Sequence, residues 1–243
     1  EDLLCPFHYF GITDLDIIAD AGKSSEEKVE NFRYLTSEER VENVMKQAEY
    51  FGYSGDRVKG LIFCSRIDEA KELSKKFNAK SWRTLVLSGS DSEEARAAAI
   101  ERLAGEESED ALDYIISVDI FSEGVDVPEI NQVIMLRPTE SPIVFIQQLG
   151  RGLRKYGDQK DCLTVLDFVG QANARYNFEE RFRALLSVTT GGTVKQIQTG
   201  FPGLPSGCVI EIEKRAQAVI LENIRQFFGR GESRMQSLIR NFE

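Results

Sequence analysis

The feature that most constrains this chain is the alternation, through its middle part, of short apolar runs with amphipathic helical patterns. The apolar runs, each a candidate buried strand, are Gly60–Cys64, Thr84–Leu87, Tyr114–Val118, Gln132–Leu136 and Cys162–Leu166. Strands that alternate with helices predict a parallel sheet covered by helices on both faces. Each connection is short enough for a βαβ unit. We therefore expect an α/β domain over about residues 55–170.

The flanks of this range are expected to be mainly helical. Residues 1–54 would form a helical N-terminal flank, and residues 171–243 a mostly helical C-terminal extension. Within the extension, residues 189–207 are rich in Gly, Pro and Thr, which is typical of a linker or long loop. Alternating residues over 208–213 predict a short strand, and apolar side chains at helical spacing predict a helix over 216–227.

Helix starts are predicted from capping residues. Ser65 stands where an N-cap would precede the helix after the first run. Asp91 with Glu94, and Thr36 with Glu39, resemble capping boxes. The apolar stripe behind the Thr36 pair consists of Val41, Val44, Met45, Ala48 and Phe51.

Length and composition indicate a globular protein. The chain has 243 residues, of which 42% are apolar and 29% charged, so it can bury a sizeable core. No apolar run approaches the roughly 20 residues of a membrane span, so we expect a soluble protein without a membrane partner. The chain begins with Glu1, and no basic-then-apolar signal pattern follows it. We expect a piece of a longer, cytoplasmic chain.

The sequence offers few residues for metal binding or thiol chemistry. The four cysteines, Cys5, Cys64, Cys162 and Cys208, lie far apart, and none has metal-ligand or redox spacing. We expect buried or half-buried thiols and no metal site. His8 is the only histidine, which disfavours catalysis by histidine.

The charge is unevenly distributed. A formal net charge of −10 argues against a chain whose whole surface grips nucleic acid. Residues 137–160 nevertheless form a positive island. Its charged residues are Arg137, Arg151, Arg154, Lys155 and Lys160 against Glu140 and Asp158. A local basic seam is therefore expected.

Two segments follow strands whose carboxyl ends would face a ligand. After Tyr114–Val118 comes a loop with Glu123, Gly124 and Asp126, in which the glycine permits close approach of the backbone to a ligand. Its carboxylates could accept hydrogen bonds from a sugar or hold a positive group. After Gln132–Leu136 comes a helix that ends at Gln147–Arg154.

The end of that helix gathers phosphate-binding groups. Gln147, Gly150 and Arg154 share one helix face, with Arg151 beside Gln147. Two guanidiniums and an amide around a glycine suit a bidentate grip on phosphate. The alternative is a solvated basic helix.

Together the two segments resemble motifs V and VI of superfamily 2 helicases. Leu61–Arg66 is similar to motif IV, and Leu87–Ser90 is similar to a small-residue turn that touches the nucleic-acid backbone, with Arg96 where the family carries an arginine. The resemblance covers about residues 55–170. DEAD-box RNA helicases begin motif VI with His-Arg where Gln147 stands here. The sequence therefore looks closer to the DExH and restriction-enzyme-like bacterial branch.

The resemblance implies the second, C-terminal RecA-like domain of an ATP-dependent motor, with a parallel sheet between helices. ATP and Mg²⁺ would be held mainly by the first RecA-like domain of the same polypeptide. Arg154 would be the arginine finger and Arg151 its partner at the γ-phosphate. The cofactor-facing residues would be Glu123, Gly124, Asp126 and Gln147.

The resemblance also implies a nucleic-acid path, with DNA favoured over RNA. The residues expected at the phosphate backbone are Ser65, Arg66, Ser88, Gly89 and Ser117. Contacts of this kind carry little sequence information, so we expect largely sequence-independent binding.

The parts of a complete motor that bind phosphate and magnesium are not evident. Gly22-Lys23-Ser24 is similar to the end of a Walker A loop, but Ile17 stands where its first glycine belongs. Asp119 and Glu123 could alternatively be an acidic box. We expect this chain to be inactive alone. The rival hypotheses are a non-catalytic nucleic-acid or protein-binding module that retains the RecA-like fold, and a Rossmann-type enzyme, which lacks its glycine fingerprint here.

Overall fold

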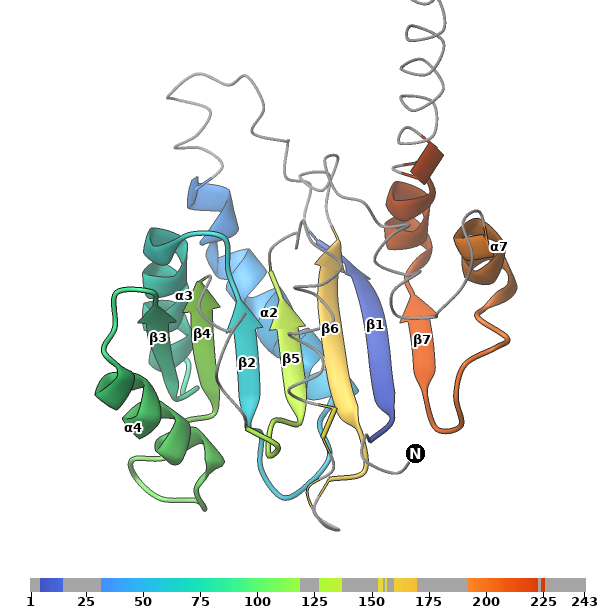
Figure 1. Cartoon of the computed structure of the whole chain (residues 1–243). Coiled ribbons are helices and arrows are strands. Elements are labelled where there is room, and N and C mark those ends of the chain that lie inside the picture. Colours follow the sequence, from blue (N-terminus) through green and yellow to red (C-terminus); the bar gives the residue numbers. More distant parts are fainter. Residues whose placement is uncertain are drawn as a thin grey trace, which may run out of the picture.

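The computed structural model describes residues 5–14, 32–118, 127–136, 153–154, 156, 160–169, 192–222 and 224–225. Their centre is a seven-stranded sheet of order β3-β4-β2-β5-β6-β1-β7 (Figure 1), in which every neighbouring pair is parallel. The strands are β1 (Phe7–Thr13), β2 (Gly60–Phe63), β3 (Thr84–Ser88), β4 (Tyr114–Val118), β5 (Gln132–Met135), β6 (Leu163–Val169) and β7 (Val209–Ile212). Because all strands run the same way, the sheet has a carboxyl edge, at the top of Figure 1, and an amino edge below.

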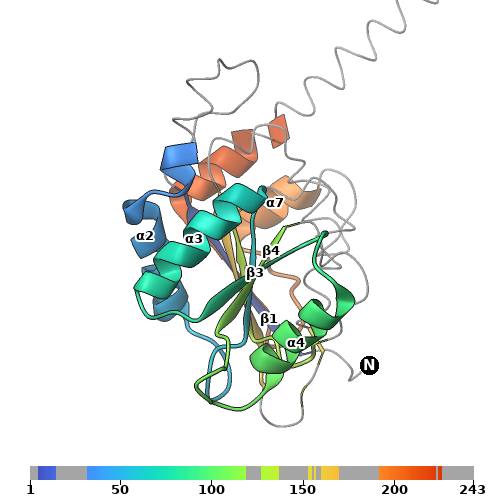
Figure 2. The same cartoon turned by 90° about the vertical axis from the view of Figure 1, so that its left-hand side faces the viewer.

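Helices cover both faces of the sheet (Figure 2). One face carries α2 (Glu38–Phe51) and α3 (Ile67–Ala79), whose apolar residues join one core cluster with Ile62, Ile116 and Ile134. The other face carries α4 (Glu93–Ala104), which contributes Ala99 and Leu103 to a second cluster. The short helix α7 (Gly192–Thr199) and helical residues 214–222 pack into that same second cluster.

The five predicted strands and the short strand predicted over 208–213 are confirmed as β2 to β7. The predicted α/β class is confirmed as well, with a parallel sheet between helices (Figure 2). The buried stripe of α2 also lies where the periodicity placed it, since Val41, Val44 and Ala48 are all buried.

The extent of the sheet differs from the expected flanks. Residues 7–13, expected in a helical flank, form β1 and pair with β6 on one side and β7 on the other. The sheet thus extends beyond residues 55–170 at both ends of that range. The reason lies in burial, because Phe7, Tyr9 and Ile12 are buried and provide the apolar faces that a strand between two others needs.

The helix starts also differ from the expectation by one residue. The N-caps are Ser37, Arg66 and Ser92 in place of Thr36, Ser65 and Asp91. Ser37 accepts a hydrogen bond from the amide of Arg40 at 3.2 Å. The Thr36 hydroxyl instead donates to the Phe32 carbonyl, one turn earlier in the chain, and the Asp91 carboxylate accepts from Ser88 in the turn before the helix.

The predicted linker over 189–207 contains helix α7, so that expectation was wrong for residues 192–199. Ile197 and Phe201 are buried in the second cluster, with Val194 packed against it. Gly200, at φ +72°, ends the helix in the left-handed conformation that glycine adopts without strain. The apolar spacing of these three side chains stabilises a helix despite the neighbouring glycines.

Candidate nucleotide and nucleic-acid interface

The carboxyl edge brings together the segments expected to touch a nucleic-acid backbone. Strands β3, β4 and β2 are adjacent, and Ser117 of β4 is in register with Phe63 of β2 and Leu87 of β3. Ser65 follows β2, and Ser88 is the last residue of β3. Three segments distant in sequence therefore meet at one edge of the sheet.

The turn after β3 is held rigidly. The Asp91 carboxylate accepts from the Ser88 amide at 2.6 Å and from the Ser88 hydroxyl at 2.9 Å, and these hydrogen bonds lower the pKa of Asp91. The Arg96 guanidinium donates to the Gly89 carbonyl at 3.0 Å. A Cβ at Gly89 would meet no atom within 4 Å. Asp91 and Arg96 thus hold the turn in place, and the space beside the Gly89 Cα is open.

Arg66 is an exposed cation at this edge. Its guanidinium makes a two-point pair with Asp68, at 3.0 and 2.5 Å, and lowers the pKa of that carboxyl. The two side chains are 54% and 51% exposed. An ion pair this exposed contributes at most about 1 kcal/mol, so a phosphate can replace Asp68 as the partner of Arg66.

Ser117 lies at the same edge but not at its surface. The residue is 0% exposed, and its hydroxyl has no hydrogen-bond partner. Its side chain shares a sheet face with Ile115, because side chains alternate along a strand and Ile115 belongs to the second core cluster. A direct contact with phosphate therefore requires Ser117 to become exposed.

Arg154 lies at the opposite, amino edge. The carbonyl of Leu153 accepts from the amide of Cys5, which precedes β1, at 2.6 Å. The carbonyl of Arg154 accepts from the ammonium of Lys160, which precedes β6, at 3.1 Å. The Arg154 side chain is exposed. A strand of five to seven residues spans roughly 17–23 Å, which separates Arg154 from the Ser65 end of the sheet.

The remaining candidate residues lie outside the described ranges. They are Arg151, Glu123, Gly124, Asp126 and Gln147. Of the positive island, Arg154 and Lys160 are described: Arg154 is exposed as expected, whereas Lys160 is buried and does not contribute to a solvated basic surface.

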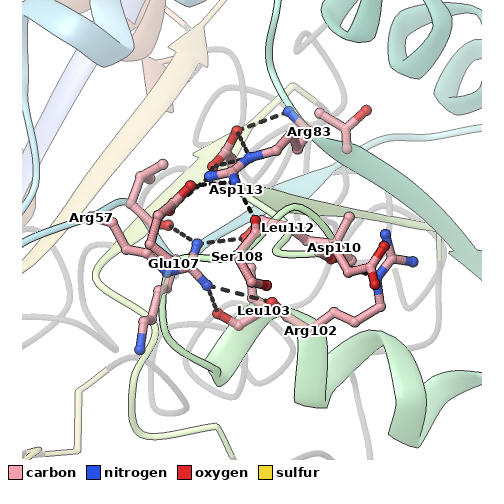
Figure 3. A network of polar contacts seen from close by, with 12 residues as sticks. Arg57, Arg83, Arg102, Leu103, Glu107, Ser108, Asp110, Leu112 and Asp113 are labelled. Carbon is pink, nitrogen blue, oxygen red and sulfur yellow. Dashed lines mark hydrogen bonds and ion pairs between the residues drawn. The ribbon is translucent and has the colours of Figure 1, made fainter.

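Several other arginines near the amino edge serve the fold (Figure 3). Arg57 donates to carbonyls at the end of α4 and beyond, including Leu103 at 2.6 Å and Leu112 at 2.9 Å. Arg83 binds Glu107 and Asp113, which raises the pKa of Arg83. These cations hold the acidic loop between α4 and β4 instead of presenting charge to a ligand.

A buried arginine at the carboxyl edge escaped the sequence analysis. Arg40 is 0% exposed and uses all five of its N–H donors. It binds both carboxylate oxygens of Asp14 at 3.2 and 2.8 Å and Glu69 at 3.3 Å. The carbonyls of Leu35 and Leu136 accept the other two bonds, at 3.0 and 3.1 Å. The sequence signal that could have indicated its burial is its position directly before Val41, the first residue of the apolar stripe of α2.

No helix in the described ranges is long and apolar enough to cross a bilayer. In the same residues, no three histidine, cysteine or acidic side chains are grouped as metal ligands.

Comparison with known proteins identifies the family. A family model described as helicase conserved C-terminal domain matches residues 27–156, more than half of the chain. The chain is 36% identical over 61 residues, 25% of its length, to the putative ATP-dependent helicase IRC3 of Saccharomyces cerevisiae, of which this covers 9%. It is 29% identical over 127 residues, 52% of its length, to the pre-mRNA-splicing ATP-dependent RNA helicase prp28 of Schizosaccharomyces pombe, of which this covers 18%. The chain spans between 9% and 34% of the curated relatives it matches.

A solved structure shows the same fold. The ATP-dependent Type ISP restriction-modification enzyme LlaBIII bound to DNA aligns with 92% of this chain and 17% of its own, at a TM-score of 0.59 and 18% identity. The family match confirms the sequence resemblance, and this structure confirms the fold. The chain belongs to the helicase conserved C-terminal domain family and is a second RecA-like domain of the superfamily 2 helicase type.

Proposed function

We propose that this chain is the C-terminal motor domain of an ATP-dependent superfamily 2 helicase or translocase, and that it supplies motifs IV, V and VI. The observation that carries the proposal is the division of candidate residues between two edges of one sheet. An open turn and an exposed guanidinium lie at the carboxyl edge, whereas the exposed side chain of Arg154 lies at the amino edge. A motor needs two such surfaces, one that binds the nucleic acid and one that binds the nucleotide.

The carboxyl edge is the nucleic-acid surface in this proposal. In this proposal the phosphates are contacted by Ser65, Arg66, Ser88 and Gly89, and by Ser117 only if it becomes exposed. Small residues and a single guanidinium suit a phosphate backbone better than base edges. DNA is favoured over RNA because motif VI begins with Gln147.

The nucleotide surface completes a site whose remainder lies on another domain. Arg154 acts as the arginine finger with Arg151 beside it, and the cofactor-facing residues are Glu123, Gly124, Asp126 and Gln147. ATP and Mg²⁺ are held mainly by the first RecA-like domain. The chain alone therefore binds ATP weakly and hydrolyses none.

The test uses the longer natural chain. ATP turnover is measured with and without DNA or RNA in the wild type and in Arg151→Ala, Arg154→Ala and Arg102→Ala. The control residue Arg102 is an arginine that donates to the Asp110 carbonyl at 2.8 Å near the amino edge. An arginine finger contributes roughly 10³–10⁵-fold in kcat, so the two motif VI variants should lose stimulated turnover while the control retains it.

The outcomes also separate the rival hypothesis. Nucleic-acid binding without any ATP turnover in the longer chain would identify a binding module that has kept the RecA-like fold. Turnover that is equal in the wild type and in Arg154→Ala would contradict the assignment of the finger.

A further inference from the structure

One buried ammonium joins the ends of the two nucleotide-facing segments. Lys160 is 5% exposed, and its Nζ donates to the Pro128 carbonyl at 2.9 Å and to the Arg154 carbonyl at 3.1 Å. Pro128 lies two residues after Asp126, at the end of motif V, and Arg154 is the last residue of motif VI. The ammonium therefore fixes one segment against the other at the backbone.

The neighbouring residue is held in the same way. The Leu153 carbonyl accepts from the Cys5 amide at 2.6 Å, and the Leu153 side chain packs against the second core cluster. Two consecutive carbonyls, those of Leu153 and Arg154, are thus anchored to the amino edge. The Arg154 side chain itself is exposed. The anchored backbone therefore fixes the position of the Arg154 Cα, from which the side chain extends.

Burial of a lysine at this position costs free energy. Removal from water lowers the pKa of Lys160, because an ammonium loses its hydration there. Neutral side chains could fill the same volume without that penalty. A charged donor, however, makes shorter and stronger hydrogen bonds to carbonyls than a neutral one. The arrangement favours a fixed position over ease of burial.

We propose that Lys160 is a positioning residue for the arginine finger. It does not touch the nucleotide, and it acts by holding the Arg154 backbone at a fixed place relative to the end of motif V. This inference rests on the proposed function, because it assumes that Arg154 reaches a phosphate. It predicts that loss of the ammonium impairs the chemical step more than nucleotide binding.

The same edge provides a matched control. Lys59 and Lys160 line one cavity of about 510 Å³, together with Tyr156. The Nζ of Lys59 donates to the Ala104 carbonyl at the end of α4, at 2.5 Å, and burial lowers the pKa of Lys59 as well. Lys59→Met therefore removes a lysine–carbonyl bond from the same cavity, and a contact with the Tyr156 ring at 6.0 Å, without removing a bond to the Arg154 carbonyl.

The experiment measures kcat and KM for ATP, with saturating nucleic acid, in the longer natural chain. The variants are Lys160→Met, Lys59→Met, Arg154→Ala and the double variant Lys160→Met with Arg154→Ala. We expect Lys160→Met to lower kcat by about tenfold or more with KM within about threefold, as for a loss confined to the transition state. Lys59→Met should keep both constants, and the double variant should be no worse than Arg154→Ala, because both changes remove one effect.

Each other outcome has a definite meaning. If Arg154→Ala abolishes turnover but Lys160→Met keeps kcat within twofold, or if the two losses multiply, the positioning role is overturned and the proposed function stands. If Arg154→Ala has no effect, the positioning role and the assignment of Arg154 as the finger are both overturned. Thermal unfolding of every variant accompanies the kinetics. Should Lys160→Met not fold, Lys160→Ala, which also removes the N–H donors, is judged by the same criteria.

Discussion

At the scale of single residues, Arg40 shows how an arginine can be buried completely. Its five donors meet five acceptors, two of which belong to Asp14 and one to Glu69. Burial raises the pKa of Glu69, and the charge of Arg40 opposes that rise. Through Asp14 and Leu136, Arg40 ties together the chain just after β1 and β5.

Replacement of Arg40 should therefore be severe. Arg40→Met leaves two buried carboxylates without their cation and should lower the free energy of unfolding by about 3–5 kcal/mol. Arg66→Met, which breaks the exposed pair with Asp68 and removes the guanidinium from above the Phe32 ring, should cost only about 1 kcal/mol. Urea unfolding followed by circular dichroism measures both. Equal losses in the two variants would show that burial of the network has no energetic consequence.

At the scale of elements, periodicity predicted the strands and the buried face of α2, but capping residues misplaced the helix starts. Thr36 and Ser37, like Asp91 and Ser92, are adjacent residues that both cap helices well. Tertiary and turn contacts decide between them. Thr36 is engaged by Phe32 and Asp91 by Ser88, and neither contact follows from the local pattern.

The observed caps give a prediction for the helices. Ser37→Ala and Ser92→Ala each remove a hydroxyl that accepts from a helix amide, at 3.2 Å in both cases. Each should lower the free energy of unfolding by about 1 kcal/mol. Ser65→Ala, at the position that the sequence favoured, should change it by less than about 0.5 kcal/mol, because Ser65 is exposed and is not the cap of α3. A larger loss at Ser65 than at Ser37 would contradict the observed helix starts.

At the scale of the whole molecule, the sequence predicted a parallel sheet but not its outer order. Nothing in residues 7–13 indicates that they pair with β6 and β7, because that choice depends on contacts between distant parts of the chain. The carboxyl-edge part of the candidate site could be predicted, since the ends of parallel strands meet at one edge. The position of Arg154 at the other edge depends on Cys5 and Lys160, whose contacts no local spacing reveals.

The two edges should differ in their response to salt. If nucleic acid lies on the carboxyl edge, Arg66→Ala in the longer chain should weaken binding and reduce the slope of log affinity against log salt by about one unit. Arg102→Ala should leave that slope unchanged, because Arg102 is bound to the Asp110 carbonyl near the opposite edge. Fluorescence anisotropy with a single-stranded oligonucleotide across a salt series measures both slopes. A reduced slope in Arg102→Ala alone would move the nucleic-acid surface to the amino edge.

The position of β1 has a consequence for how the protein is made. Phe7 pairs with Leu163, and His8 with Val209, so both neighbours of the first strand are synthesised long after it. At about 5–20 residues per second, β1 leaves the ribosome on the order of ten seconds before β6 exists to receive it. Strands β2 to β5 can associate in that interval, whereas β1 waits as an unpaired apolar strand. The sheet is therefore completed only when β6 and β7 have been synthesised and pair with β1.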